Sequence, residues 1–167
     1  DDHHGSAGWG DYYLKAKKVI FKKGITSIGA GAFDNFQKLE EVVLPEGLKA
    51  IKASAFFSCY RLKKINVPKT LRTIASDVFI ATKIESFSLR RVKKIGNMCF
   101  LDSKIKEVYL SKDCRSSSLV FGGCEKLKKV TLEDGIKKIS YGMFCDTALK
   151  TIDIPGSVFQ IGEDAFA

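Results

Sequence analysis

Basic side chains recur at nearly constant intervals along this chain, and their type and spacing suit them to binding anions. One series precedes a short apolar motif each time: Lys38, Arg61, Lys83, Lys104 and Lys126. A second lies beside another apolar pair: Lys49, Arg72, Lys93 and Lys137. Because stacked like charges repel one another, such rows are costly unless they reach into solvent. They predict either a polyanion-binding surface, for a sulfated glycan, lipid head groups or nucleic acid, or a solubilising edge.

Residues for catalysis are scarce. Both histidines, His3 and His4, lie in a polar, Gly-rich opening, so the rest of the chain has no histidine base for a serine or cysteine nucleophile. No Gly-rich phosphate loop follows a strand pattern, and the carboxylates are scattered among lysines. We therefore expect no catalytic residue, no cofactor and no enzymatic activity.

The five cysteines form no C-x-x-C pair, and we predict no metal site from them: Cys59, Cys99, Cys114, Cys124 and Cys145. Cys59 and Cys124 occupy the same slot three units apart, roughly 14 Å if each unit adds one strand spacing. A disulfide cannot bridge that distance. Cys124 and Cys145 lie in adjacent units and are the one pair that could bond, so this pair stays open between disulfide and free thiols.

Composition indicates a single globular domain with a basic surface. The chain has 167 residues, of which 45% are hydrophobic and 28% charged, and its formal net charge is +9. That charge favours anionic partners. No apolar run is long enough to span a bilayer, and no signal peptide opens the chain. Residues 1–10 are expected to be a tag or linker remnant, and residues 11–167 one domain.

The elements that must position these residues follow a phenylalanine that recurs every 21–23 residues: Phe33, Phe56, Phe79, Phe100, Phe121, Phe144 and Phe166. Five or six residues after each comes a motif L-x-x-V-x-L, whose last two apolar residues flank one polar position. This period of two predicts a strand buried on one face. The expected strands are 39–44, 62–67, 84–89, 105–110, 127–132 and 149–154, with a degenerate first strand at Val19 and Phe21.

If the units stack, the outward strand positions form one open sheet face, on which we predict binding. Its residues are Glu41, Val43, Lys64, Asn66, Ser86, Ser88, Glu107, Tyr109, Lys129 and Thr131, continued by Thr151 and Asp153. Tyr109 lies near the middle, and tyrosine is a frequent hot-spot residue. The alternative is a solvated face with ordinary charge pairing between neighbours.

Whole units such as ALKTIDIPGSVFQIGEDAFA at residues 148–167 resemble the BspA-like leucine-rich repeat, and the resemblance covers about Val19 to Ala167. It implies an α/β leucine-rich-repeat solenoid, right-handed, with a parallel sheet on one side and short helical turns and irregular segments on the other. Six or seven repeats of 21–23 residues are expected, the first degenerate and the last truncated. The resemblance also implies an extracellular or cell-surface location and adhesion or protein recognition, without catalysis.

Three local features depart from the regular pattern. After Leu110 the expected apolar pair is replaced by SKDCRSSS, so residues 111–118 should form a looser or bulged loop. The residues that follow three of the phenylalanines either pack under the turn or form an apolar strip: Phe57, Ile80 and Leu101. An aromatic group near the start is expected to cover the first edge of the array: Trp9, Tyr12, Tyr13 and Leu14.

The function predicted from the sequence is noncatalytic recognition of a host or neighbouring macromolecule, such as a protein or extracellular-matrix component. The first alternative is a polyanion-binding module that uses the basic rows, and the second is an intracellular scaffold. The last unit stops just after Phe166, so weak self-association through the C-terminal edge is also expected.

Overall fold

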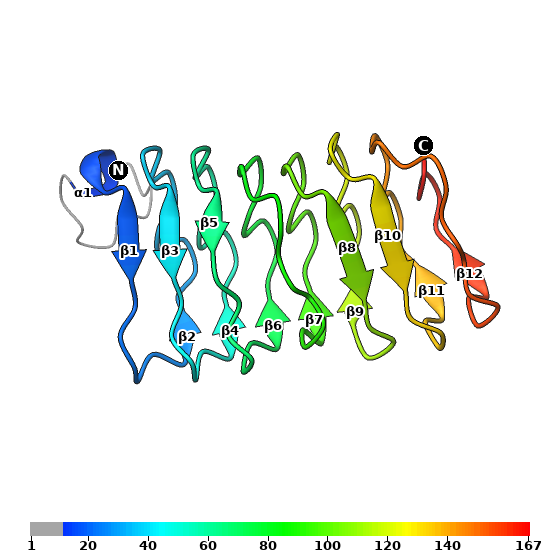
Figure 1. Ribbon diagram of the computed structural model, residues 1–167, viewed down its shortest axis with the longest axis horizontal. Helices are drawn as coiled ribbons and strands as arrows, with labels where there is room; N and C mark the ends of the chain where they lie inside the picture. Colours follow the sequence, from blue (N-terminus) through cyan, green and yellow to red (C-terminus); the bar gives the residue numbers. More distant parts are fainter. Residues whose placement is uncertain (1–11) are drawn as a thin grey trace.

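The computed structural model describes residues 12–167, which form a solenoid of about seven stacked turns (Figure 1). The expected tag remnant and Trp9 lie outside the described residues. The short helix α1 (Tyr12–Lys15) precedes the first strand, and its Tyr13 packs against the core. Tyr12 and Leu14 are exposed, so only Tyr13 of the described aromatic group helps to cover the first unit.

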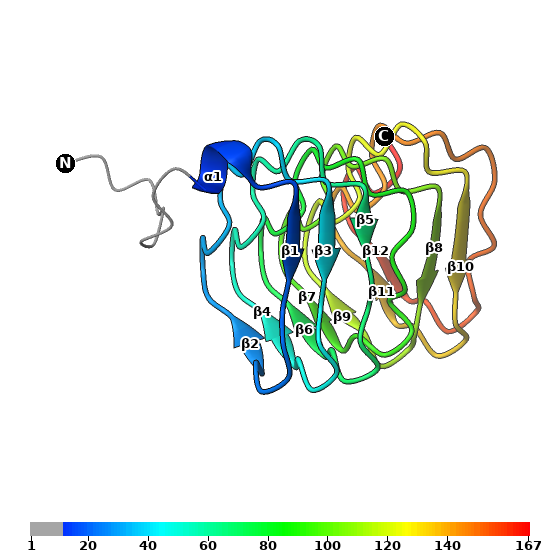
Figure 2. The same ribbon diagram turned by 60° about the vertical axis from the view of Figure 1, so that its left-hand side comes forward.

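Short parallel strands form two ladders along the solenoid, seen as separate rows in Figure 2. The first ladder contains β1 (Lys18–Ile20), β3 (Glu41–Val43), β5 (Lys64–Ile65), β8 (Glu107–Leu110) and β10 (Lys129–Leu132). The second contains β2 (Ser27–Ile28), β4 (Ala50–Ile51), β6 (Thr73–Ile74), β7 (Lys94–Ile95), β9 (Arg115–Ser116), β11 (Lys138–Ile139) and β12 (Gln160–Ile161). Each strand pairs with the same position of the neighbouring unit, which confirms the predicted stacking of sequence repeats.

The first ladder is interrupted between β5 and β8, where the strand expected at residues 84–89 does not form. Phe87 occupies the slot that holds Val42 or Val108 in other units, and its ring packs against Phe79 and Phe100. Within residues 12–167, the segment from Ser86 to Ser88, which carries this larger side chain, makes no backbone hydrogen bond. The strand expected at residues 149–154 is also absent, although Leu149 and Ile152 still pack against the core.

The phenylalanines form one continuous column inside the solenoid. Neighbouring rings from Phe33 to Phe166 stack with centroids 5.2–5.8 Å apart and planes 4–26° from parallel. The six from Phe33 to Phe144 are buried. Burial of apolar area at roughly 25 cal/mol per Å² is the main stabilising term for such a column. The prediction that identical apolar residues align in internal columns is confirmed.

Each phenylalanine lies in a tight corner of hydrogen-bonded turns rather than in the short helix expected there. In the six corners from Phe33 to Phe144, the residues two before and two after the phenylalanine have left-handed backbones, with φ between 50° and 64°, as at Asp77 and Ala81 around Phe79. An α-helix cannot contain such alternation, because a left-handed residue breaks the right-handed path. Within residues 12–167 the only helix is therefore α1.

The corners are joined by a third ladder of hydrogen bonds that all run one way. The N–H groups of Asp77, Phe79 and Ala81 donate to carbonyls of the following unit at 3.0, 2.8 and 2.8 Å. The same pattern repeats around Phe33, where three N–H groups again donate forward at 2.8–2.9 Å. The left-handed residues make this possible, since they turn alternate N–H groups to the same side.

The segment SKDCRSSS at residues 111–118 pairs on one side only, because β9 is the last strand of its sheet and does not pair with β11. The expectation of a looser or bulged loop is therefore right in part. Arg115 and Ser116 of β9 pair in register with β7. Cys114 takes the position of Leu48, since its N–H bonds to the carbonyl three residues earlier and its side chain packs against the core. The unit accommodates the change by having one residue fewer between Cys114 and its strand.

Side-chain hydroxyls close the turns that follow the first ladder. The Thr70 hydroxyl accepts from Gly47 N–H at 3.0 Å and donates to the Leu48 carbonyl at 2.8 Å. Ser157 makes the same two bonds to Gly135 and Ile136, at 2.8 and 2.9 Å. Each hydroxyl thereby ties one turn to the equivalent turn of the preceding unit.

All five cysteines are free thiols, so the open pair of Cys124 and Cys145 is unbonded in this structure. Cys59 and Cys124 occupy the same slot, as expected, and donate to the carbonyls of Phe33 and Phe100 at 3.2 and 3.1 Å. Burial raises the pKa of Cys59 to about 12 and that of Cys124 to about 11. These thiols are therefore small core residues. Phe57, Ile80 and Leu101 are half-buried, which favours packing under the turn over an exposed strip.

Candidate functional site

The outward side chains of the first ladder form a single face, called here the first sheet face. The register places Glu41 beside Lys64, Glu107 beside Lys129, and Tyr109 beside Thr131. Ser86 and Ser88 are exposed between β5 and β8. The structure thus brings together the residues predicted for this face, although the ladder that carries them is interrupted.

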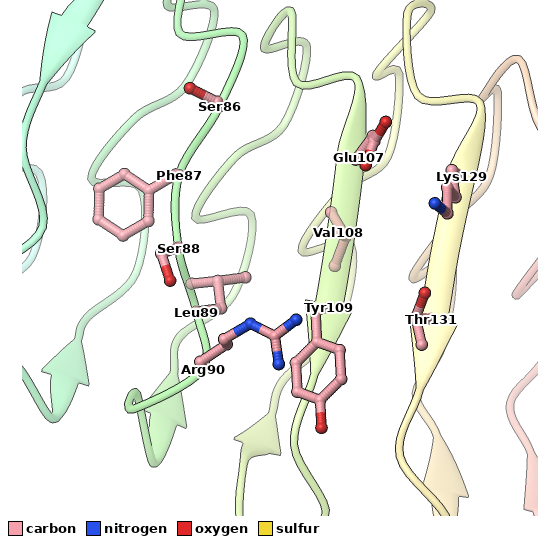
Figure 3. A pocket seen from close by; sticks show the side chains of 10 residues that line it. All are labelled: Ser86, Phe87, Ser88, Leu89, Arg90, Glu107, Val108, Tyr109, Lys129 and Thr131. Atoms are coloured by element: carbon pink, nitrogen blue, oxygen red, sulfur yellow. The ribbon is translucent and has the colours of Figure 1, made fainter.

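The interruption coincides with a hollow of about 330 Å³ in the middle of the face, called here the central hollow (Figure 3). The polar side chains that line it come from three successive units: Ser86, Ser88, Arg90, Glu107, Tyr109, Lys129 and Thr131. The Arg90 guanidinium lies over the Tyr109 ring, with Cζ 4.1 Å from the ring centroid. A guanidinium on an aromatic face is held in place by a cation–π interaction.

Arg90 was not among the predicted binding residues. It is the next outward position in the alternation of Ser86 and Ser88, so a longer period-two pattern was the signal that could have found it. The expected strand ended at Leu89, one residue before Arg90.

Two predicted face residues have structural partners. The Asn66 carboxamide accepts from Leu44 N–H at 2.6 Å and donates to the Leu44 carbonyl at 2.8 Å, so it extends the ladder in place of backbone. Val43 is half-buried. Beside them Glu41 pairs with Lys18 at 2.8 Å and Glu40 pairs with Lys63 at 2.7 Å. The polar and charged side chains in the first half of the face are therefore largely paired with groups of the protein itself.

Glutamates that the sequence analysis did not weigh neutralise part of the predicted basic row. Lys104 pairs with Glu125 at 3.3 Å, and Lys126 pairs with Glu85 at 3.6 Å. Glu85 also accepts a hydrogen bond from Lys106, and this bond together with the charge of Lys126 holds the pKa of Glu85 below its ordinary value. Lys38, Arg61 and Lys83 remain exposed at the start of the row.

A cluster of four lysines lies at the other end of the face. A hollow of about 470 Å³, called here the lysine hollow, is lined by Lys106, Glu107, Lys126, Lys128 and Lys129. Among the residues that the structure describes, Lys128 and Lys129 have no ion-pair partner. The sequence analysis missed Lys106 and Lys128, although both follow the first apolar residue of their strand motif, as Lys63 does.

The second basic series is continuous over three successive units. The Arg72 N–H donates to the Lys49 carbonyl at 3.0 Å, and the Lys93 N–H donates to the Arg72 carbonyl at 2.7 Å. The Arg72 guanidinium donates to the carbonyls of Lys69 and Leu71 at 2.8 and 2.9 Å, so part of its hydrogen-bonding capacity is used internally. Arg72 and Lys93 line a hollow of about 180 Å³ together with Arg90, Arg91, Ser111 and Asp113. Lys49 is exposed beside Arg72, and Lys137 is exposed two units after Lys93.

Groups for metal or acid–base chemistry do not converge on this face. Across residues 12–167, no three His, Cys, Asp or Glu side chains lie close enough together to hold a metal ion. No helix of this described portion is long and apolar enough to cross a bilayer. What the face offers a partner is hydroxyl groups, ammonium and guanidinium cations and one tyrosine ring, which suit binding by hydrogen bonds and charge.

A family described as "BspA type Leucine rich repeat region" matches residues 11–119 and 116–167 in six copies. Among curated proteins, no sequence matches this chain.

Solved structures of bacterial leucine-rich repeat proteins share the fold. A Bacteroides ovatus protein has a TM-score of 0.76 and 23% identity over 87% of this chain and 47% of its own. The Treponema pallidum leucine-rich repeat protein has a TM-score of 0.72 and 24% identity over 88% and 73% of the two chains. A Faecalibacterium prausnitzii leucine-rich cell surface protein has a TM-score of 0.58 and 26% identity over 90% and 36%. The present chain thus spans about half the length of the Bacteroides relative.

Proposed function

This chain belongs to the BspA-type leucine-rich repeat family, and on that premise we propose that it is a noncatalytic recognition module whose first sheet face binds another protein. The observation that carries the proposal is the central hollow, in which Arg90 is fixed over Tyr109. Tyrosine and arginine are enriched among residues that dominate binding energy.

The central hollow has the composition of a protein-binding site. Its floor includes apolar atoms of Phe87, Leu89 and Val108, and its rim carries hydroxyls and charges of both signs. A partner side chain that enters it can bury apolar area against the floor and hydrogen-bond to Ser88 or Thr131 at the rim. This combination of an apolar centre and a polar rim is typical of interfaces between proteins.

Pre-organisation also supports the proposal. Because the guanidinium of Arg90 already rests on an aromatic ring, it loses less side-chain freedom on binding than an unrestrained arginine. Its N–H groups are positioned to donate to a carboxylate of the partner. We therefore expect the partner to place an acidic side chain at Arg90.

Where the protein acts is part of the proposal. One structural neighbour is named as a cell surface protein, which supports an extracellular or surface location and a partner such as a host protein or extracellular-matrix component. The five unpaired thiols favour the alternative, an intracellular scaffold, because disulfides are rare in reducing compartments. The mode of binding is the same in both settings.

The test compares capture of purified extracellular-matrix proteins by wild type, Tyr109→Ala and Arg90→Ala, with Tyr141→Ala as control. Tyr141 is an exposed tyrosine on a corner outside the first sheet face. We expect a matrix protein whose affinity drops at least about tenfold in the first two variants and stays unchanged in the control. Capture of no matrix protein, or equal loss in the Tyr141 control, would contradict the proposal.

A further inference from the structure

The lysine hollow carries a charge that the rest of the first sheet face lacks. Four ammonium groups surround it, and the one carboxylate in its lining is Glu107. Of these lysines, Lys106 and Lys126 share Glu85 as their acidic partner. Lys128 and Lys129 have no ion-pair partner among the described residues. Lys129 is the first residue of β10, and Lys128 directly precedes it.

This arrangement differs from the first half of the face, where cation and anion alternate. There Lys18 and Glu41 pair across β1 and β3, and Lys63 and Glu40 pair one position earlier. Just before β8 and β10, Lys106 lies next to Lys128, where the first half has Glu40 next to Lys63. Within the strands Glu107 lies next to Lys129, as Glu41 lies next to Lys64. Two lysines thus stack in neighbouring units at this hollow, where the first half of the face has a lysine beside a glutamate.

We propose that the lysine hollow binds a sulfated polysaccharide, with Lys128 and Lys129 as the principal sulfate contacts. Lysine ammonium groups are compact point charges that suit single sulfates without requiring a two-pronged geometry. The lysine hollow shares Glu107 and Lys129 with the central hollow. A linear glycan can therefore continue from the lysines toward the hydroxyls of Thr131 and Ser88.

Nucleic acid fits this surface less well. Single-stranded nucleic acids are bound by basic grooves that also offer aromatic faces for base stacking. Tyr109 is the one aromatic side chain of the two hollows that is not buried, and the Arg90 guanidinium covers its ring. A sugar polymer needs no stacking platform, and the serine and threonine hydroxyls along the face match its own hydroxyls.

The test measures binding of heparin, a highly sulfated polysaccharide, to wild type and to Lys128→Gln/Lys129→Gln. The matched control is Lys22→Gln/Lys23→Gln, which removes the same two charges from an exposed adjacent pair in the first unit. We expect about tenfold weaker binding in the first double variant and less than about a twofold change in the control. Affinity should also fall steeply between about 50 and 200 mM salt, because sulfates release condensed counterions.

Three other outcomes would overturn this proposal. Equal losses in both double variants would mean that heparin responds to net charge alone. Double-stranded DNA bound as tightly as heparin at equal charge concentration would indicate a general polyanion surface, and desulfated heparin bound as tightly would exclude sulfate recognition. This assay contains no protein partner, so its failure is separate from failure of the Tyr109 experiment, which leaves Lys128 and Lys129 intact.

Discussion

The ring of Phe87 packs against the ring of Phe100 with centroids 5.2 Å apart and planes 62° from parallel. Phe87 reaches this position from the strand side of the unit, whereas Phe100 belongs to the stacked column. The edge-on contact adds an aromatic side chain where other units hold valine or isoleucine. We infer that the extra volume holds the backbone of residues 86–88 away from its neighbours and thereby opens the central hollow.

Replacing Phe87 by valine should therefore restore strand pairing. We expect amide hydrogen exchange at residues 86–88 to slow, because their N–H groups would gain carbonyl acceptors in the neighbouring units. Hydrogen-exchange mass spectrometry or NMR checks this. The reciprocal variant Val108→Phe serves as the control and should accelerate exchange in β8. Unchanged exchange at residues 86–88 in Phe87→Val would show that ring size is not the cause.

Truncating a phenylalanine in the middle of the column should strongly destabilise the folded protein. Phe100 is fully buried and contacts the rings of Phe79, Phe87 and Phe121. We expect Phe100→Ala to lower the free energy of unfolding by about 3–5 kcal/mol, since the cavity cannot collapse between fixed neighbours. Phe159, which is 77% exposed, is the control. Phe159→Ala should change the free energy of unfolding by less than about 0.5 kcal/mol. Urea unfolding followed by circular dichroism measures both.

The hydroxyl of Thr70 should contribute more to the free energy of unfolding than its methyl group does. Thr70→Val keeps the shape but leaves Gly47 N–H and the Leu48 carbonyl without their side-chain partner. We expect the free energy of unfolding to fall by about 1–3 kcal/mol. Thr70→Ser retains the hydroxyl and should recover most of the loss in the same urea titration. Equal destabilisation by serine and valine would assign the effect to the lost methyl contacts instead.

Acidification should strengthen heparin binding through Glu85. Its pKa lies below the ordinary value of 4.5, so the carboxylate stays ionised and occupies Lys106 and Lys126 from pH 7 down to that range. As the pH falls through the lowered pKa, protonation releases both ammonium groups while sulfates stay ionised. Glu85→Gln should bind heparin more tightly at pH 7 and gain less on acidification than wild type. Isothermal titration calorimetry of both proteins, at pH 7 and at a pH below the pKa of Glu85, measures these differences in affinity.

Thiol labelling should separate the cysteines by burial. In the native protein at pH 8, we expect no reaction at Cys59, Cys99 and Cys124, because burial both shields these thiols and raises their pKa. Half-buried Cys114 and Cys145 should react slowly, since burial raises their pKa as well. In denaturant all five should react at once. A chromogenic disulfide reagent gives the counts, and fast native labelling of Cys124 would contradict this assignment.

The repeat architecture could be predicted from the sequence because it depends on equivalent positions. Once Phe56 and Phe79 are recognised as equivalent, stacking of their rings follows from the geometry of parallel strands. The central hollow could not be predicted this way, because it arises where one unit differs. The size of Phe87 has its effect only against the rings of Phe79 and Phe100, which the linear pattern does not place beside it.

Charge was also harder to predict than packing. The basic row was visible in the sequence, but its neutralisation depends on side chains in different units, such as Lys126 and Glu85. These two residues lie 41 positions apart, and the pattern of single positions gives no sign of their contact. The backbone of the corners was missed for a related reason. Left-handed conformations at Met98 or Leu119 go against the residue type and are imposed by the neighbouring units.

The one-way hydrogen bonding at the corners gives the solenoid a net dipole along its long axis. Each peptide unit has a dipole of about 3.5 D. Because the corner N–H groups of Phe33, Phe79 and Phe144 all point toward the following unit, these dipoles add instead of cancelling. The positive pole faces later units, so a new turn can dock only with its carbonyls toward that pole. If the array grows by duplication of repeats, each inserted segment must therefore consist of whole turns in the same orientation as the existing ones.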